Sequence, residues 1–346
     1  DAVQLHVRGS GVPRCRSARS CAASLIGRND NRRMNTEVAL KGLVRIGYLA
    51  CIRVSGAQAG AFLQSQLTSS FVDLSHGRAQ LAGFCSAKGR LQASFIGWKQ
   101  GETDFILICA ADLLAATLKR LSMFVLRMKC RLSDASAELP VLGWAGTEAT
   151  PSMQDLALWE LRESDDGTAI RLPDAGQTRL GLWIPRFEAA ARTDGDLTLT
   201  QDEWRWLQVL SGLPIIEART VDMFVPQMIN FELLGGVDFG KGCYPGQEVV
   251  ARSQYRGTLK RRMFLFDCAA QASAGQEVFG SIDPAQPAGV VVNAAPHPQH
   301  PGSTALIELK LSELQRGTLH LGDPGGPILL RRSLPYDIVF PASERL

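Results

Sequence analysis

The chain has 346 residues, of which 45% are hydrophobic and 21% are charged, and this composition is typical of a globular protein with about two or three domains. Its formal net charge of only +3 argues against a dedicated nucleic-acid-binding protein. No run approaches the roughly 18 apolar residues of a membrane-spanning helix, so we expect no membrane partner and a cytoplasmic location.

Arginine residues are concentrated at the start of the chain. Residues 1–33 contain seven arginines and two aspartates, and this surplus leaves a formal charge of −2 for the remaining residues. The segment shows no amphipathic helical periodicity and is followed by Met34. We interpret it as an extension ahead of a start at Met34, with a transit-like leader as the alternative, and we expect it to be disordered.

Residues 34–145 predict a first lobe of mixed α+β structure. Residues 57–67 have helical spacing, with Ser55 as the expected N-cap. A Lys-Gly-Arg turn at residues 88–90 predicts a hairpin with Gly89 at positive φ. The connections between strands are too short for parallel crossovers, so the strands are expected to be antiparallel. Strands are predicted at 49–54, 79–85, 91–98, 104–109, 129–133 and 141–144, and a second helix at 111–123.

A second lobe is expected over residues 146–262. Its first part is rich in Asp, Gly, Thr and Pro and contains one helix-like piece at 153–161. A strand is expected at 180–184, and a helix at 201–210 is expected to end at Gly212. The long segment that follows this helix carries few local structure signals, and loops of this kind in compact domains are usually functional.

Residues 263–346 predict a small antiparallel β-barrel or sandwich, because short β-like runs alternate with Gly and Pro turns. His297 and His300 have a spacing that metal ligands can have, but their Pro-His-Pro-Gln-His-Pro context favours an exposed turn. The β-like runs lie at 263–268, 277–279, 289–293 and 304–309.

The chain contains eight cysteines, none of them in a Cys-x-x-Cys pair. Several lie within apolar, strand-like runs, which is typical of cysteines in a reducing compartment. We therefore predict no disulfide framework and no metal or cluster site.

One loop has the composition of a functional site. Residues 239–248, here called the cysteine loop, read Phe-Gly-Lys-Gly-Cys-Tyr-Pro-Gly-Gln-Glu, and their glycines and proline exclude an ordinary helix or strand. If the loop folds against the basic run that follows it, the pKa of the Cys243 thiol is lowered and the thiol becomes reactive. The alternative is that Cys243 is a small buried apolar residue. The basic run consists of Arg252, Arg256, Lys260, Arg261 and Arg262.

The wider segment around this loop resembles a known family. Residues 224–252, here called the signature segment, begin with Phe-Val-Pro-Gln and end with Lys-Gly-Cys-Tyr-Pro-Gly-Gln-Glu-Val-Val-Ala-Arg. They are similar to the signature of the YgfZ-like folate-binding proteins, which are relatives of the glycine-cleavage aminomethyltransferase (T-protein). Further matches at 54–56, 62–68, 88–90 and 287–293 extend the resemblance from about residue 43 to residue 336.

This resemblance implies an α+β fold in which two intertwined lobes surround a central folate-type pocket and a C-terminal antiparallel β-barrel follows. It also implies an accessory protein that binds tetrahydrofolate or a one-carbon derivative and supports iron–sulfur enzyme maintenance and tRNA methylthiolation. The implied partners are folate and iron–sulfur enzymes such as a tRNA methylthiotransferase.

Two departures from the enzyme relatives bear on activity. The relatives carry an Asp-Asp pair after the hairpin, whereas residues 91–95 contain no acid. Loss of a general acid–base group typically costs about 10²- to 10⁴-fold in rate. Many relatives also carry a glutamate where this chain has Leu210, so an acceptor for the pterin ring is absent. The sequence thus argues against aminomethyl transfer and leaves open whether the protein catalyses a reaction.

The resemblance places Cys243 as the catalytic residue of a folate site. Gln227 and Asn230 offer neutral donors and acceptors to a heteroaromatic ligand, and Arg252 is suited to the carboxylate of a folate tail. The alternative for the amides is that they satisfy the backbone of a long loop. The predicted cofactor-binding set is Gln227, Asn230, Lys241, Gln247, Glu248 and Arg252.

Three functions remain open at this point. The first is a folate-dependent accessory factor that uses Cys243, and the second is a one-carbon transferase with altered chemistry. The third is a module that contacts tRNA weakly through the basic run, for which a solvated loop or an anion clamp is the alternative.

Overall fold

The computed structural model describes residues 40–146, 153, 155–186, 197–255, 259–314 and 317–338. They lie within Ala39–Leu346, which forms a single unit by its internal contacts. The extension predicted at 1–33 and Arg256 of the basic run fall outside the described residues. No helix in the described ranges is both long and apolar enough to cross a lipid bilayer.

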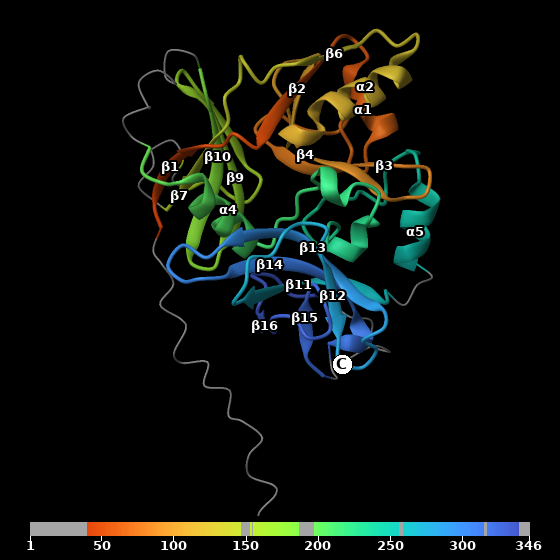
Figure 1. Cartoon of the computed structure of the whole chain (residues 1–346). Coiled ribbons are helices and arrows are strands. Elements are labelled where there is room, and N and C mark those ends of the chain that lie inside the picture. Colours follow the sequence, from red (N-terminus) through yellow and green to blue (C-terminus); the bar gives the residue numbers. More distant parts are fainter. Residues whose placement is uncertain are drawn as a thin grey trace, which may run out of the picture. The chain divides into compact units, whose positions relative to one another are not determined.

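The first sheet is antiparallel and has the strand order β3-β4-β5-β2-β6 (Figure 1). Helix α1 (Ala59–Gln66) packs against β5, and α2 (Leu114–Val125) packs against β2 and β6. The predicted strands and both helices are confirmed, but Ser55 is not the N-cap of α1, because β2 continues through Ser55 and Gln58 precedes the helix. The other bounds are β2 Leu49–Ser55, β3 Ala79–Cys85, β4 Leu91–Lys99, β5 Asp104–Ala110, β6 Arg131–Asp134 and the 3₁₀-helix η1 Ala111–Leu113.

The second sheet has the order β1-β7-β10-β9-β8 and is also antiparallel. Strands β1 and β7 come from residues before 146 and pair with each other, and β7 also pairs with β10, which comes after residue 146. Segments distant in the sequence therefore share this sheet, while the lobe boundaries themselves stay a prediction. The bounds are β1 Gly42–Arg45, β7 Leu142–Ala145, β8 Leu161–Ser164, β9 Gly167–Ala175 and β10 Thr178–Pro185.

The helix-like piece predicted at 153–161 is wrong for the described residues of that range. Asp155 and Trp159 have φ values of 62° and 61°, which an α-helix does not allow. The Leu161 N–H donates to the Gly77 carbonyl at 2.8 Å, and strand β8 begins at Leu161. The apolar side chains of this range pack onto a sheet from a series of turns, so their spacing resembles a helical pattern without a helix.

The third sheet follows the signature segment and has the order β15-β12-β13-β14-β11-β16. Its two edge strands are joined by a tight turn, in which the Leu321 N–H donates to the Pro327 carbonyl and His320 forms a bridge with Ile328. The sheet therefore curls toward closure. The bounds are β11 Arg261–Cys268, β12 Glu277–Gly280, β13 Pro287–Pro296, β14 Ser303–Lys310, β15 Leu319–Leu321, β16 Leu329–Arg332 and the 3₁₀-helix η5 Leu311–Glu313.

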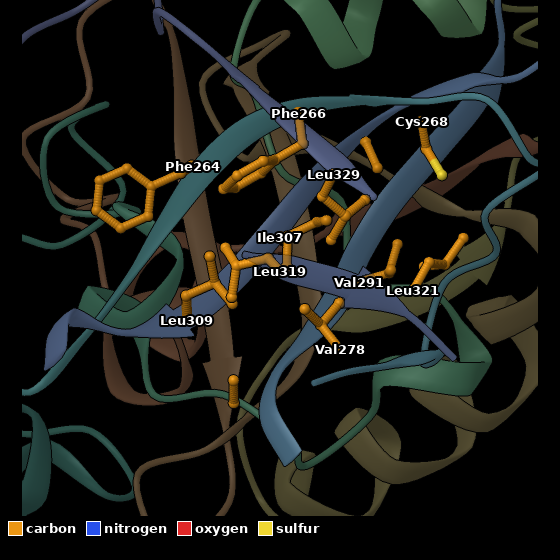
Figure 2. Close-up of a cluster of buried hydrophobic side chains, with 12 residues drawn as sticks. Phe264, Phe266, Cys268, Val278, Val291, Ile307, Leu309, Leu319, Leu321 and Leu329 are labelled. Atoms are coloured by element: carbon orange, nitrogen blue, oxygen red, sulfur yellow. The ribbon is translucent and has the colours of Figure 1, made fainter. Parts of the chain in front are cut away.

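Apolar side chains from all of these strands converge inside the curled sheet (Figure 2). Phe264 and Phe266 of β11 lie beside Ile307 of β14 and Val291 of β13, and each is at most 2% exposed. The expected mixed α and β fold with several sheets is confirmed, and the third sheet forms a curled half-barrel where a small β-barrel or sandwich was expected. The arrangement of two lobes around a central pocket stays a prediction.

Helix α4 (Gln201–Leu210) packs between the second and third sheets, with contacts to β1, β9, β13 and β14 (Figure 1). Thr200 and Glu203 form a capping box at its start, which satisfies two of the first free N–H groups. The Trp206 indole N–H donates to Thr304 Oγ1 of β14 at 3.0 Å. The helix predicted at 201–210 is thus confirmed, and it connects the β-rich C-terminal part to the rest of the unit.

His297 and His300 stack on each other with ring centroids 4.8 Å apart, and His297 meets the Trp206 ring edge-on. His297 is half-buried, in contrast to the exposed turn expected for it, and burial followed by the His300 charge lowers its pKa. Within the described ranges, no group of three His, Cys, Asp or Glu residues is placed to hold a metal ion. The six cysteines described there are all free.

Candidate functional site

The cysteine loop packs against the tip of the β3–β4 hairpin through two glycines. Gly89 has a φ of 68°, as predicted for the hairpin turn, and Gly246 has a φ of 78°. A Cβ atom at Gly246 would lie 2.7 Å from the Gly89 Cα and closer still to the Ser86 carbonyl oxygen. Only glycine at Gly246 permits this approach, so the loop and the hairpin meet backbone to backbone.

The chain at the start of the signature segment is bonded to Arg90 and Leu91, where the same hairpin leaves its turn. The Leu91 N–H donates to the Phe224 carbonyl at 2.8 Å, and the Asp222 N–H donates to the Leu91 carbonyl at 2.9 Å. The Arg90 guanidinium donates to the Met223 carbonyl. The turn end of the hairpin therefore holds the signature segment at two places, its start and Gly246.

Two buried amides stabilise the 3₁₀ turn η4 (Pro226–Ile229) within the signature segment. Gln227 and Asn230 are both 0% exposed. Gln227 Nε2 donates to the Val250 carbonyl and Asn230 Nδ2 to the Met263 carbonyl, each at 2.8 Å. The side-chain oxygens of both amides lack a partner among the described residues. Their amide nitrogens thus serve the backbone, and only the two oxygens are free to accept a further bond.

An ion pair lies beneath this turn. Arg262 NH1 donates to the Gln227 carbonyl at 2.9 Å and to Glu232 Oε1 at 2.5 Å. The side chains of Arg262 and Glu232 are only 5% and 6% exposed. Burial raises the pKa of Glu232, and the guanidinium beside it opposes that shift. Arg262 is therefore a structural residue that connects β11 to the signature segment.

Lys241 bonds the cysteine loop to the C-terminal end of α1. Its Nζ donates to the Gln64 carbonyl at 2.5 Å, to the Leu67 carbonyl, and to the Ser69 carbonyl at 3.4 Å. The last carbonyls of a helix lack intrahelical donors and carry partial negative charge, so they offset part of the cost of burying the ammonium group. The Lys241 Nζ also lies 5.1 Å from the centre of the Tyr244 ring.

The stability difference between the wild type and Lys241→Met is expected to change with pH. Burial lowers the pKa of Lys241 to about 8, from 10.5 for a free lysine. Between these two values the unfolded chain binds more protons than the folded chain, so the wild type gains stability relative to the variant as the pH rises. Urea unfolding of both proteins from about pH 7 to pH 10.5 measures this difference. A difference that stays constant or falls over that range contradicts the expectation.

Cys243 is exposed, although Lys241 two residues before it is bonded and Tyr244 directly after it is buried. Tyr244 is 7% exposed, and burial raises the pKa of its hydroxyl group. Gly242, on the other side, has open space where a side chain would begin, with no atom within 4 Å. The alternative of a buried packing cysteine is therefore wrong for Cys243. The loop is held by Lys241, Tyr244 and Gly246 while its thiol faces solvent.

The last two residues of the cysteine loop begin a helix, α5 (Gln247–Tyr255). A solvated basic loop was one of the alternatives for this part of the chain. The helix begins because the N–H groups of Val249 and Val250 donate to the Gly246 carbonyl. Glu248 and Arg252 are exposed on it, and Gln247 is half-buried. The structure thus brings five predicted site residues onto the loop and its helix: Lys241, Cys243, Gln247, Glu248 and Arg252.

The basic run does not form one exposed surface. Arg261 NH2 donates to Glu308 Oε2 at 2.9 Å, and Arg262 is buried against Glu232. Arg252 and Lys260 are exposed. Two of the five positive charges are therefore neutralised inside the protein, a result that the closeness of the five charges in the sequence did not reveal.

A small cavity lies between the first sheet and the chain that follows α4. Its volume is about 10 Å³, and its walls include Phe95 of β4 together with Leu213 and Ile215. The polar group among them is the Ser94 hydroxyl, which accepts a bond from the Ile216 N–H at 2.9 Å. These apolar walls suit a flat ring, but a cavity of this volume holds one water molecule and does not admit a pterin.

Thr68 is the last residue of the match at 62–68, and its side chain makes hydrogen bonds that connect distant segments. It is 0% exposed, and its hydroxyl donates to the Gly236 carbonyl at 2.5 Å and accepts from the Gly83 N–H at 2.7 Å. Its own carbonyl accepts from the Asp238 N–H at 2.9 Å. Thr68 thus joins β3 to the residues just before the cysteine loop. A single threonine carries no local signal of such long-range bonds.

Comparison with solved structures identifies the class of fold. The crystal structure of the glycine cleavage system aminomethyltransferase T from Bartonella henselae superposes with a TM-score of 0.67, covers 86% of both chains and is 18% identical. The protein therefore has the fold of an aminomethyltransferase T, and at this identity the likeness extends to the fold alone.

Sequence comparison identifies the family, although no family model matches the chain. The tRNA-modifying protein YgfZ of Edwardsiella ictaluri is 32% identical over 240 residues, which cover 64% of this chain and 70% of that protein. The tRNA-modifying protein YgfZ of Klebsiella pneumoniae is 30% identical over 241 residues, with 66% and 73% covered. The chain belongs to the YgfZ family, as the signature segment indicated.

Proposed function

We propose that this protein supports tRNA modification through the Cys243 thiol, as an accessory factor for an iron–sulfur enzyme that methylthiolates tRNA. Relatives in its family are named tRNA-modifying proteins, which supports the tRNA part of the proposal. The observation that carries the thiol part is the exposure of Cys243 within a loop that three neighbouring contacts hold in place. A cysteine that served packing alone would be buried.

The absence of an acid from β4 supports an accessory role over aminomethyl transfer. Residues 91–95 at the start of β4 contain no acid, and the hydroxyl of Ser94 among them is already bonded to the Ile216 N–H. A serine hydroxyl does not exchange protons near neutral pH as a carboxylate does. With no acid in this strand, the proposal assigns the chemistry to the Cys243 thiol of the cysteine loop.

Replacing Cys243 by serine is expected to abolish support of tRNA methylthiolation, because serine nearly keeps the size of the side chain and removes the sulfur nucleophile. The measurement is the methylthio content of tRNA from cells that lack their own relative and express the variant. Cys130→Ser is the matched control, since Cys130 is a partly exposed cysteine outside the cysteine loop, directly before β6, and its replacement is expected to leave the support unchanged. Full support by Cys243→Ser would remove the thiol from the proposal.

The proposal includes tetrahydrofolate or a one-carbon derivative as the ligand, on the strength of the fold shared with the aminomethyltransferase. The cavity beside Ser94 is too small for the pterin, so the proposal does not assign the ring to it. The exposed Arg252 guanidinium is available for the carboxylates of the folate tail.

Titration with tetrahydrofolate is expected to change the tryptophan fluorescence in a saturable way. Arg252→Ala is expected to weaken binding by roughly tenfold, the value of one charge-assisted bond. Cys243→Ala is expected to leave the affinity unchanged. A wild type that shows no saturable change with any reduced folate would remove folate from the proposal and leave the thiol part to be judged by complementation.

A further inference from the structure

We propose that a surface at the end of α2 binds tRNA, and this inference rests on the proposed function in tRNA modification. The surface, here called the basic tip, lies where α2 runs into the edge strand β6 (Figure 1). It is distinct from the cysteine loop and from the basic run after it. The basic tip consists of Lys119, Arg120, Met123, Phe124, Leu126, Arg127, Lys129 and Arg131.

The positive charges of the basic tip are exposed and uncompensated. Its five cations are all exposed, and no acidic residue occurs between residues 119 and 131. None of the five forms an ion pair with any described residue, whereas Arg53, Arg171 and Arg205 elsewhere in the chain are paired with carboxylates. A cluster of one sign on a nearly neutral protein attracts a polyanion.

The acids that flank the basic tip are occupied. Asp112 Oδ2 accepts a bond from the Ala218 N–H at 3.0 Å, and Asp134 Oδ1 accepts from the Ser136 N–H at 2.9 Å. The Ser136 hydroxyl, followed by its N–H, lowers the pKa of Asp134. Both carboxylates keep their negative charge, but two acids beside five cations leave this end of α2 with a positive surplus.

Three apolar side chains lie among these cations. Met123, Phe124 and Leu126 are 59%, 40% and 86% exposed, which is unusual for large apolar residues. Leu126 has a φ of 47°, so the chain presents this leucine at a sharp turn after α2. In single-stranded parts of an RNA, an unpaired base stacks on an aromatic ring while its phosphates bind cations. Phe124 between Arg120 and Arg127 provides this combination.

A lipid surface would use the same kinds of side chain, but the structure favours RNA. The inner face of α2 is committed to the first sheet through the buried Thr117 and Leu121, so the helix cannot lie flat in a bilayer interface with an apolar face of its own. The outer face mixes cations with apolar groups, and a folded RNA loop offers phosphates and bare base faces at similar spacing. Binding to anionic vesicles is nevertheless a defined outcome of the test.

The test is retention of unmodified tRNA on a filter by the full-length protein, at a series of salt concentrations. Arg120→Gln combined with Arg127→Gln is expected to lower the affinity at low salt by at least about fivefold and to flatten the salt slope by about 1.5, from two lost phosphate contacts. Phe124→Ala is expected to lower the affinity by roughly tenfold without changing the slope. The matched control is Arg78→Gln combined with Arg219→Gln, two exposed arginines outside the basic tip.

The proposal would be overturned if the Arg120/Arg127 variant and the Arg78/Arg219 control lost the same amount of tRNA affinity. It would also be overturned if the wild type retained no tRNA at low salt. Binding to phosphatidylglycerol vesicles without tRNA retention would also overturn it, in favour of a lipid partner. All substituted residues are exposed, so unchanged thermal melting is expected and excludes misfolding as the cause. If Cys243 is needed for methylthiolation but the wild type retains no tRNA, this inference fails alone; if Cys243→Ser supports methylthiolation fully, the proposed function fails alone.

Discussion

Replacing Gly246 by alanine is expected to destabilise the protein by about 3 kcal/mol and to abolish its support of tRNA methylthiolation. Two costs add at this position. Gly246 has a φ of 78°, where an alanine is strained, and the new Cβ would lie 2.7 Å from the Gly89 Cα. Neither backbone can give way without breaking the contact between the cysteine loop and the hairpin. Urea unfolding gives the stability, and the methylthio content of tRNA gives the function.

Gly242→Ala is the matched control for this prediction. It adds the same methyl group to the same loop, but no atom lies within 4 Å of the new Cβ. We expect a change below about 0.5 kcal/mol and full support of methylthiolation. If both variants lost similar stability and function, the loop would tolerate no added atom at either position. The contact of Gly246 with the hairpin would then not explain the effect of Gly246→Ala.

The second large effect is expected at the ion pair beneath η4. Arg262→Met should destabilise the protein by about 3–5 kcal/mol, because the Glu232 carboxylate is left buried without its partner. The Gln227 carbonyl loses its donor in the same step. Chemical unfolding monitored by circular dichroism measures the loss.

A double variant separates the charge effect from the loss of packing. When Glu232→Leu is combined with Arg262→Met, no charge is buried, and we expect more than half of the lost stability to return. A double variant that is less stable than Arg262→Met alone would show that the pair contributes net stability. The structural role assigned to Arg262 would stand, but the stated reason for it would not.

Elements with strong local patterns could be predicted from the sequence. The strands of the first sheet, the Lys-Gly-Arg hairpin and α4 all follow from period-2 or helical spacing and from turn glycines. Residues 155–160 could not be predicted, because their buried Leu156 and Trp159 reach the core from turns with left-handed backbone. The spacing of buried side chains indicates periodicity only where the backbone is regular.

The candidate site was only partly predictable for a different reason. The exposed loop and its cysteine are visible in the sequence, whereas the partners that hold it are distant along the chain. Lys241 bonds to carbonyls near residue 65, and Arg262 is neutralised by Glu232, thirty residues before it. A run of cations looks like a binding surface in a sequence when its acidic partners come from other elements. The basic tip is the opposite case. The sequence did not predict it as a binding surface, yet its five cations form no ion pair with the described residues.

The open space beside Gly242 allows large molecules as well as small ones to approach the Cys243 thiol. A thiol at the bottom of a pocket reacts only with molecules that fit the pocket, but this thiol stands at the surface and faces no wall on its glycine side. A maleimide carried on a large polymer should therefore label Cys243 nearly as fast as a small maleimide does, while the buried Cys85 and Cys109 stay unlabelled. Chemistry at such a position is suited to exchange between two macromolecules in contact.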